Sequence, residues 1–400
     1  MSILENLKPE EVEALKKAYL SRPTREQAIQ SLNASINTIK QGYREVWCTG
    51  FDKLDEKLGG GFFGGQLIFL GAISSLGKTS FALQIADQIA SSGQDVLLFS
   101  LEMSSEELLA KSISRQTYLL TNTGDTLDKV KAKDRLKTRD ILQGRVGSLM
   151  DDSTLFMQAE KETAKLNNHL HYIIGENDID VDTVRLLTEL HISSNPGSRP
   201  IIILDYLQIL RPTKDALERR LDKRLGTDDD VTRLKVLARD LKLPVLVISA
   251  FNRASYLDPV SMASFKESSG IEYSSDVLMG MQFKGMDFKK HFYTKPNGTK
   301  VKGYESSQDH DNRVRDLYNS MQERANNGGN QDIELKILKN RTGEKGSLFF
   351  SFYPTYNYYC ESDLIKDKEV LDWDDEINEP DFDEAQPISY EVGEAKGIKK

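Results

Sequence analysis

The chain has 400 residues, of which 38% are hydrophobic and 29% charged. That length and composition suit one large globular domain with appendages, or two small domains. We find no apolar run of about 18 residues, and the first residues are amphipathic and acidic, unlike a signal peptide. Two cysteines, Cys48 and Cys360, are too few for a disulfide framework or a zinc site. We therefore expect a cytoplasmic protein that neither is secreted nor spans a membrane.

The net charge of −9 is concentrated in one segment. Residues 361–400 carry 14 Asp and Glu against 5 Lys and Arg, whereas residues 1–360 hold 48 of each sign. The acidic pI therefore does not argue against a nucleic-acid partner, whose binding surface would come from local clusters of basic residues. Because residues 361–400 also lack periodic apolar positions, we expect a disordered acidic tail.

Residues 1–46 are predicted to form a short helical segment. Pro9 lies just after Lys8, where a first helix can begin, and Thr24 to Gln27 supply a cap and a first-turn carboxylate for a second helix. These residues are too few to bury a core of their own.

From residue 47 to residue 360, short apolar stretches alternate with amphipathic helical ones. Strands are predicted over 66–70, 95–100, 201–205 and 245–249. Apolar strands separated by helices indicate an α/β fold with a mostly parallel central sheet covered by helices on both faces. Two polar stretches, near 122–168 and 284–331, interrupt this rhythm. We interpret both as insertions, the first helical in character and the second basic with one helix around 312–325.

A phosphate-binding motif lies between the first predicted strand and the next helix. The stretch from Gly71 to Thr79 fits the pattern G-x-x-x-x-G-K-[ST] except that Ala72, directly after Gly71, holds the first glycine position; in this pattern backbone N–H groups and a helix N-terminus hold phosphates. Lys78 is predicted to neutralise the β- and γ-phosphates, and Thr79 to ligate Mg²⁺. The alternative is a Gly-rich turn with an exposed lysine. Strand, loop and helix occur in the order that a nucleotide site requires, so we predict ATP and Mg²⁺ as ligands.

Two carboxylates follow predicted strands of the same sheet. Asp205 ends the apolar run 201–205, as the Walker B acid of a P-loop enzyme does, although an Asp that caps a helix would fit there too. Glu102 follows strand 95–100, where it could activate water, but a first-turn helix acid fits that position equally well. The residues predicted to bind nucleotide and Mg²⁺ are Gly71, Ser74, Ser75, Gly77, Lys78, Thr79, Ser80 and Asp205, with Thr79 and Asp205 as the metal ligands.

The order of these motifs resembles the motor domain of DnaB-type hexameric replicative helicases, which has a RecA-like P-loop fold. The resemblance covers residues 49–358. Besides the P-loop it rests on the stretches Thr49-Gly50-Phe51-Asp52-Lys53-Leu54-Asp55, Phe99-Ser100-Leu101-Glu102-Met103 and Asp205-Tyr206-Leu207-Gln208. It implies an ATP-dependent helicase that acts on single-stranded DNA as a ring-shaped homo-oligomer, expected to be a hexamer. It also implies a role in replication of a bacterial, phage or mobile-element genome, and suggests a helicase loader or a primase as a partner.

The resemblance also implies catalytic roles. Glu102 would be the carboxylate that activates water. Lys339 and Arg341 match a Lys-x-Arg pair that this family places against the γ-phosphate of the neighbouring subunit, where Arg341 would act as an arginine finger. Without the resemblance, Arg341 would be interpreted as an exposed residue at a hairpin tip.

DNA contacts in this family come from loops, here those that follow the strands ending at Asp205 and Ser249. The candidate DNA-binding residues are Arg211, Lys214, Arg219, Arg220, Arg224, Arg253 and Lys266. Acidic residues such as Asp215, Glu218 and Asp222 are interleaved with the first five, so a solvated helix face is the alternative interpretation.

Three features depart from the family pattern. The usual Ser-Gln-Leu-Asn-Arg stretch is Ser249-Ala250-Phe251-Asn252-Arg253 here, and Ala250 lacks the amide that reports the state of the γ-phosphate to the DNA loop. Only residues 24–42 resemble the linker helix, and the helical N-terminal domain that meets primase is not recognised. The insertion near 284–331 is longer than expected.

Two other functions are therefore considered. An ATPase of the same fold could use nucleotide for assembly or regulation without unwinding DNA, and Ala250 favours that alternative. A DNA-binding or loader-recruiting protein without hydrolysis is a third hypothesis. It is disfavoured because Lys78, Thr79, Glu102 and Asp205 are all present.

Overall fold

The computed structural model describes residues 8–20, 24–40, 46–122, 135–147, 154–175, 178–252, 255–265, 268–294 and 300–362. The chain divides into two units, Met1–Ser362 and Asp363–Lys400, close to the boundary predicted after residue 360. The expected disorder of the acidic tail lies outside the described residues, as do Arg253 and Lys266, two of the DNA-binding candidates.

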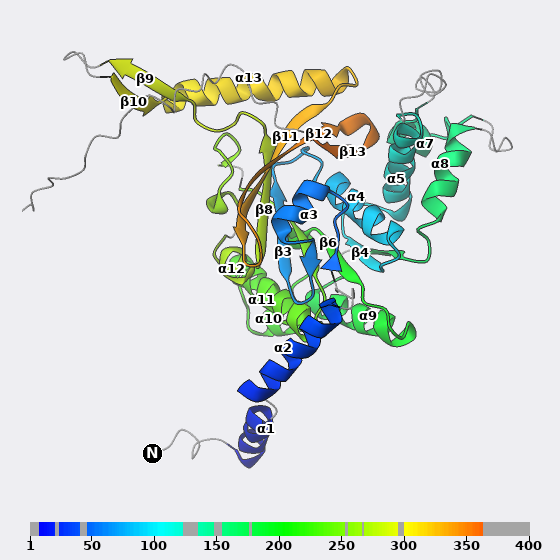
Figure 1. Ribbon diagram of the computed structural model, residues 1–400, viewed down its shortest axis with the longest axis vertical. Coiled ribbons are helices and arrows are strands. Elements are labelled where there is room, and N and C mark those ends of the chain that lie inside the picture. The colour runs from blue at the N-terminus through cyan, green and yellow to red at the C-terminus, as the bar shows by residue number, and fades with distance from the viewer. Residues whose placement is uncertain are drawn as a thin grey trace, which may run out of the picture. The chain divides into compact units, whose positions relative to one another are not determined.

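A nine-stranded sheet forms the centre of the first unit (Figure 1). Its strands lie in the order β13-β12-β11-β8-β3-β7-β6-β4-β5. The six strands from β8 to β5 are parallel, and β11, β12 and β13 are antiparallel. The mostly parallel sheet is thus confirmed. The strands are β3 Leu67–Ala72, β4 Val96–Ser100, β5 Leu170–Ile174, β6 Ile201–Asp205, β7 Val245–Ala250, β8 Val277–Phe283, β11 Gln331–Asn340, β12 Gly346–Tyr353 and β13 Tyr358–Glu361.

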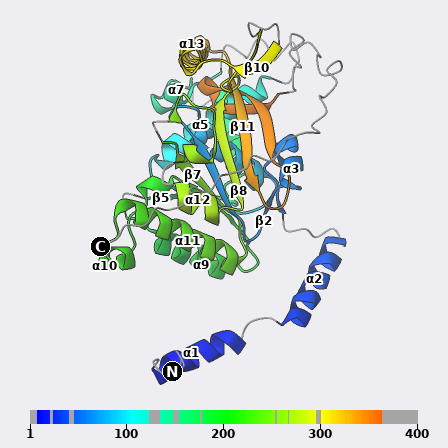
Figure 2. The same ribbon diagram turned by 90° about the vertical axis from the view of Figure 1, so that its left-hand side faces the viewer.

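Helices cover the parallel strands on both faces. The connections through α4 (Lys78–Ser91) and α5 (Ser105–Leu120) run one way across the sheet, and those through α9 (Val181–Ser194) and α11 (Lys223–Leu241) run back. Because such crossovers are right-handed, the two pairs lie on opposite faces. Accordingly α4 packs against α5, and α9 packs against α11. Figure 2 shows α9 and α11 side by side. All residues of β3, β4 and β6 are buried, as the sequence predicted.

The parallel strands end together at one edge of the sheet, which we call the carboxyl edge. Ala72 of β3 pairs with Ala250 of β7 and with Met281 of β8, and Ser100 of β4 pairs with Asp205 of β6. The predicted strand 66–70 therefore continues to Ala72, because both neighbouring strands extend alongside it. Loops that leave the carboxyl edge are brought close to one another, as ligand sites in parallel sheets require.

Both predicted insertions contain regular structure. In the first, α7 (Thr138–Leu142) and α8 (Leu155–Ala164) pack on α5. In the second, α13 (Ser307–Asn326) confirms and extends the predicted helix. An antiparallel hairpin of β9 (Lys290–Thr294) and β10 (Lys300–Tyr304), not predicted from the sequence, precedes α13.

The segment before the sheet contains the two helices that were predicted, α1 (Pro9–Leu20) and α2 (Arg25–Lys40). Thr24 and Gln27 cap α2 reciprocally, with N–H to side-chain oxygen distances of 2.8 and 3.2 Å. β1 (Val46–Trp47) then pairs with β2 (Phe62–Phe63), and α3 (Asp52–Leu58) lies between them. Among the helices that the structure describes, none combines the length and the hydropathy that a membrane span requires.

Candidate functional site

The loop between β3 and α4 has the backbone of a phosphate-binding loop. Gly77 caps α4 with φ of 72°, in the left-handed region. A Cβ atom built on Gly77 would lie 2.5 Å from the Phe352 ring and 2.7 Å from the Tyr359 hydroxyl oxygen. Both the conformation and the close packing therefore require glycine. The N-terminus of a 14-residue helix consequently opens directly onto the carboxyl edge.

Lys78 is held over the loop by backbone carbonyls. Its Nζ donates to the carbonyl oxygens of Ala72 at 2.9 Å and Ile73 at 3.0 Å. Burial lowers the pKa of Lys78 to about 8, and the carboxylates of Asp205 and Glu102 partly oppose that shift. The lysine is thus a desolvated cation, whose attraction for a phosphate is stronger than in water.

Thr79 and Asp205 meet as a metal-binding pair would. The Thr79 hydroxyl donates to Asp205 Oδ2 at 2.6 Å. Burial raises the pKa of Asp205 to about 6, against the opposing Thr79 hydrogen bond. A hydroxyl and a carboxylate are the hard oxygen ligands that Mg²⁺ takes from proteins, so these residues fit the predicted ion. The described residues contain no cluster of three or more His, Cys, Asp or Glu side chains that could hold a metal by protein ligands alone.

Glu102 lies beside this pair because β4 and β6 are neighbours. The Leu101 amide donates to the Asp205 carbonyl oxygen at 2.8 Å, which fixes the chain just before Glu102. A cavity of about 550 Å³ forms between the P-loop, the end of β6 and the start of α5. Of the predicted residues, its lining includes Ser74, Ser75, Gly77, Lys78, Thr79, Ser80, Glu102 and Asp205, while Gly71 lies within β3.

Sequence reasoning missed one cation of this cavity and the residue that holds it. Lys111 of α5 lines the cavity, and its Nζ donates to Asn357 Oδ1 at 2.9 Å. Burial lowers the pKa of Lys111. Asn357 is buried between β12 and β13, and its Oδ1 also accepts from Ser80 Oγ at 3.0 Å. Lys111 follows Glu102 by nine residues, but only the packing of α5 shows that it faces the cavity.

Lys339 and Arg341 lie at the opposite edge of the sheet. Arg341 NH1 donates to Asp276 Oδ1 at 3.1 Å, and Asp276 Oδ2 accepts from the Leu67 amide at 2.8 Å. Leu67 begins β3, whereas Lys78 is bonded to its end at Ala72. Five residue steps along a strand span roughly 16 Å. Arg341 therefore does not reach the P-loop of its own chain.

Lys339 is fixed near Arg341. Its Nζ donates to the Glu272 carbonyl oxygen at 2.5 Å, and burial lowers its pKa. The Arg341 side chain is half exposed, at 53%. The predicted hairpin turn between two strands is confirmed, since Arg341 follows β11 and precedes β12.

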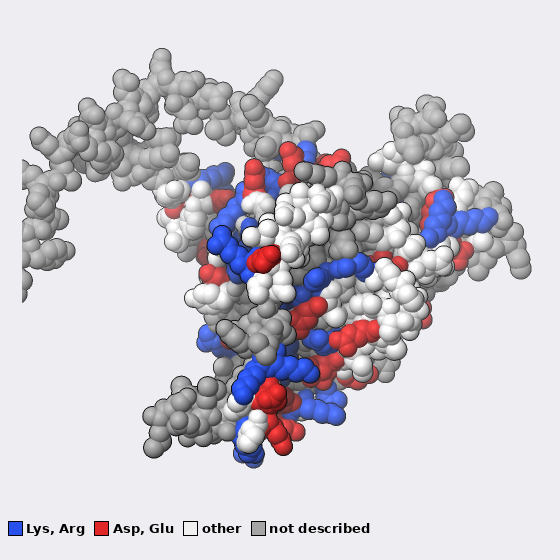
Figure 3. Space-filling view, turned by 60° about the horizontal axis from the view of Figure 1, so that its bottom comes forward, with Lys and Arg blue, Asp and Glu red and all other residues white. Residues whose placement is uncertain are grey.

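The basic residues predicted after β6 lie around α10 (Lys214–Glu218) and the start of α11. Arg211, Lys214, Arg219, Arg220 and Arg224 are all exposed. Arg219 is nevertheless paired with Asp215 at 3.1 Å and with Asp229 at 3.4 Å. Figure 3 turns the side that carries α10 and α11 toward the viewer, and there basic and acidic side chains alternate. This surface has a mixed charge, so a DNA contact would depend on individual arginines.

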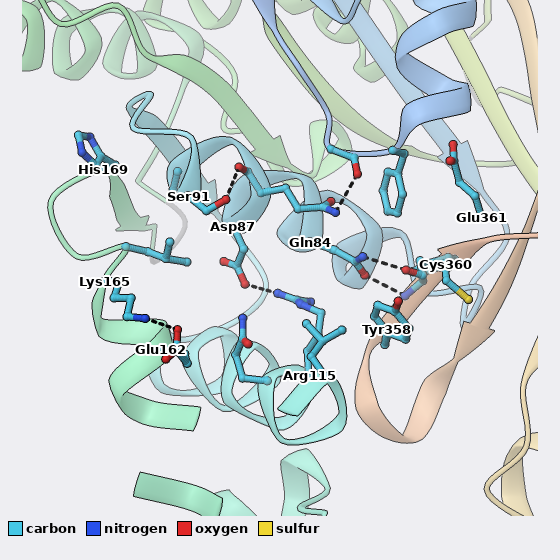
Figure 4. A pocket seen from close by; sticks show the side chains of 18 of the residues that line it. Gln84, Asp87, Ser91, Arg115, Glu162, Lys165, His169, Tyr358, Cys360 and Glu361 are labelled. Carbon is cyan, nitrogen blue, oxygen red and sulfur yellow. Dashed lines mark hydrogen bonds and ion pairs between the residues drawn. The ribbon is translucent and has the colours of Figure 1, made fainter. Parts of the chain in front are cut away.

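A second cavity, of about 700 Å³, lies further along α4 and α5 (Figure 4). Gln84, Asp87 and Arg115 line it. The buried Arg115 guanidinium donates to the Asp87 carboxylate and, at 3.1 Å, to the Asn357 carbonyl oxygen. Burial raises the pKa of Asp87, and the Arg115 charge opposes that shift. None of the predicted nucleotide-binding residues lines this cavity, so the smaller cavity is the one that corresponds to the predicted nucleotide site.

Comparison with known proteins bears on the same segment. Residues 47–361 match the DnaB-like helicase C terminal domain family. The chain belongs to this family. The match covers the whole nine-stranded sheet, both insertions and the hairpin that carries Arg341.

Curated relatives of this DnaB-like domain are replicative DNA helicases. It is 30% identical to DnaB of Pasteurella multocida over 240 residues, which are 58% of this chain and 45% of that protein. It is 27% identical to DnaB of Geobacillus stearothermophilus over 317 residues, 78% of this chain and 55% of that protein. The chain thus spans about half the length of the curated relatives it matches.

Solved structures confirm the fold. One of them, an ATPase domain, superimposes with a TM-score of 0.62 at 19% identity, covering 86% of this chain and 100% of that one. A DnaB-like replicative helicase described with its primase interactions gives a TM-score of 0.60 at 19% identity, covering 90% and 74%. The RecA-like architecture expected from the sequence is therefore shown.

Although position 250 holds alanine in this DnaB-like domain, a glutamine from the loop after β6 is hydrogen-bonded to the backbone there. Gln208, three residues after Asp205 at the end of β6, donates from Nε2 to Ser249 Oγ at 2.9 Å. Its Oε1 accepts from the Ala250 amide at 3.2 Å. The loop after β6 is thus bonded to the end of β7, and Ala250 lines the same cavity as the P-loop. An amide side chain joins these two strand ends despite the alanine.

Proposed function

We propose that this chain is the motor of an ATP-dependent DNA helicase that translocates on single-stranded DNA. It acts as a ring of identical copies, a hexamer, in the cytoplasmic replication of a bacterial, phage or mobile-element genome. Membership of the DnaB-like family supports this function. The observation on which the proposal rests is that the predicted catalytic residues lie at two opposite edges of the sheet. Lys78, Thr79, Glu102 and Asp205 meet at the carboxyl edge, while Arg341 lies at the opposite edge. In a head-to-tail ring, the opposite edge of one copy faces the cavity of the next.

Each residue has a role in this mechanism. Lys78, already desolvated, binds the β- and γ-phosphate oxygens, and Glu102 orients and deprotonates the attacking water. Thr79 and Asp205 would hold Mg²⁺, which neutralises phosphate charge when bound. Arg341 and Lys339 stabilise the charge that develops on the γ-phosphate of the adjacent copy.

Assembly or regulation without unwinding is the second candidate function. Ala250 favours it, because a methyl group cannot report the presence of the γ-phosphate to a DNA loop. Gln208 favours the motor, because its amide already joins the loop after β6 to the end of β7. A helicase loader or a primase is the protein partner we propose for the motor.

The decisive experiment measures the ATPase rate with and without single-stranded DNA, together with a sizing run in nucleotide. The motor predicts strong stimulation by DNA and a species of ring size. A basal rate that DNA does not change, with assembly that follows nucleotide, would support the second candidate instead. No hydrolysis under either condition would contradict both.

Neutralising Arg219, Arg220 and Arg224 together is expected to lower the affinity for single-stranded DNA and to flatten its salt dependence. Each lost phosphate contact reduces the log–log slope by roughly 0.7, so the triple variant should lose about 2. Arg239→Gln is the matched control, since Arg239 is an exposed arginine at the far end of α11. If the triple variant kept the parental slope, these arginines would be interpreted as part of a solvated helix face that does not contact DNA.

A further inference from the structure

The β9–β10 hairpin has a basic and aromatic sequence that the proposed nucleotide and DNA sites do not use. Its described positions, 288–294 and 300–304, contain four lysines and no Asp or Glu. The chain as a whole has more acidic than basic residues. A segment of this composition is therefore attracted to polyanions.

The register of the hairpin sorts these residues by face. Lys290 pairs with Tyr304, Phe292 with Lys302, and Thr294 with Lys300. Directly opposed residues and alternate residues share one face of an antiparallel pair. One face therefore holds three lysines and two aromatic residues, with each aromatic opposite a lysine. The other face holds His291, Tyr293, Val301 and Gly303.

The base of the hairpin is built into the domain by polar contacts. Glu305 Oε1 accepts from the Lys289 amide at 2.9 Å and from Arg313 NH2 at 2.5 Å. Arg313 also donates to the carbonyl oxygens of Gly285 and, at 2.8 Å, Asp287. The hydrogen bonds that Glu305 accepts from Arg313 and from the Lys289 amide hold the pKa of Glu305 well below its ordinary value. Arg313 of α13 thus connects Glu305, which follows β10, to the loop between β8 and β9.

Apolar packing fixes the same base. His310 is fully buried, its Nε2 lies 2.8 Å from the Met286 carbonyl oxygen, and Phe288 stacks on its ring with centroids 3.8 Å apart. Figure 1 shows the hairpin continuing directly into α13. A two-stranded hairpin alone is only marginally stable in water. Two independent sets of contacts therefore anchor the hairpin where it leaves the domain.

The hairpin follows a strand that ends at the carboxyl edge of the sheet. It follows β8, whose Met281 pairs with Ala72 at the end of β3. Tyr318 of α13 donates to the Tyr256 carbonyl oxygen at 3.1 Å, and the Tyr256 hydroxyl lies 3.5 Å from Ser74 Oγ of the P-loop. The insertion is therefore in contact with the segment after β7, where the second group of DNA-binding residues is predicted.

We propose that the Lys290–Lys300–Lys302 face of the hairpin binds single-stranded DNA. Bases stack on Phe292 and Tyr304, and the three lysines contact phosphates. Alternating aromatic and basic positions on one face are the arrangement that single-strand binders use. Lysines alone would fit a duplex equally well, but stacking requires unpaired bases. Tyr304, 66% exposed, is open to such contact. The choice of DNA as the nucleic acid rests on the proposed function.

Two variants of the full chain test the two kinds of contact by equilibrium binding to an oligothymidylate across a salt series. Lys290→Gln, Lys300→Gln and Lys302→Gln together should reduce the log–log slope by about 2. Phe292→Ala with Tyr304→Ala should weaken binding roughly tenfold or more, with an unchanged slope. Arg315→Gln, an exposed arginine of α13, and Tyr293→Ala, on the other face of the hairpin, are the matched controls.

The outcomes separate this proposal from the proposed function. Parental affinity and slope in both hairpin variants overturn it, even if DNA still stimulates the ATPase. An equal loss of duplex and single-strand binding, with no effect of the aromatic variant, overturns the single-strand assignment. Hairpin-dependent binding without any DNA-stimulated ATPase supports the hairpin and contradicts the motor. An unchanged DNA-independent ATPase rate in each variant shows that the fold is intact.

Discussion

Arg341→Ala is expected to bind ATP with parental affinity and to hydrolyse it about a thousandfold more slowly, the loss typical of removing an arginine finger from phosphoryl transfer. The defect should arise in trans, because Arg341 is bonded to Asp276, which accepts from the amide of Leu67 at the start of β3, whereas the P-loop follows the end of β3. The fold should persist, since Asp276 keeps the Lys235 ammonium at 2.5 Å. Single-turnover hydrolysis and nucleotide binding, measured on the assembled variant, provide the comparison.

Mixed rings test whether Arg341 acts on a neighbour. Lys78→Ala copies retain Arg341 but have a defective phosphate loop, so mixing them with Arg341→Ala copies creates some interfaces in which both parts are intact. Part of the activity should return if the sites fire independently. Lys345→Ala, an exposed substitution in the same turn, is the control and should be silent. Normal turnover by Arg341→Ala, or by an isolated monomer, would leave Arg341 as a polar hairpin residue only.

Lys78→Ala and Glu102→Gln should both abolish steady-state turnover but differ in nucleotide affinity. Lys78 contacts phosphate in the ground state, so its loss weakens binding as well as catalysis. Glu102 acts on water, so Glu102→Gln should bind ATP normally and turn over about 100- to 10,000-fold more slowly. Binding of a fluorescent nucleotide and ATPase rates separate the two. Glu106→Gln, a substitution of an exposed acid in the next turn, is the matched control. Near-parental hydrolysis by Glu102→Gln would show that Glu102 is not the base that activates water.

The meeting of most candidate nucleotide-site residues in one cavity could be predicted, because these residues adjoin strands with strong apolar patterns. The P-loop, Glu102 and Asp205 each follow such a strand, and parallel strands must end at one edge. Lys111 could not be predicted in this way. It lies inside α5, and the packing of α5 against α4 decides which of its polar residues faces the cavity.

The β9–β10 hairpin illustrates a missed local signal. Asn297-Gly298 between two stretches of aromatic and β-branched residues is a hairpin signal in the sequence, but the stretch was interpreted only as the basic part of an insertion. The edge of the sheet at which Arg341 lies could not be predicted from a local sequence signal. It depends on β11 running antiparallel to β8, which is a long-range pairing that the sequence does not specify locally.

The position of Asn357 has a consequence for biosynthesis. Its side chain holds both Lys111 and Ser80, which is 277 residues earlier in the chain. A nascent chain emerges N-terminus first, at about 5–20 residues per second. The P-loop is therefore synthesised roughly 14 to 55 seconds before the residue that completes its surroundings. During that interval ATP cannot stabilise the growing domain through its finished site, and β3, β4 and β6 have to stay soluble by other means, such as chaperone binding.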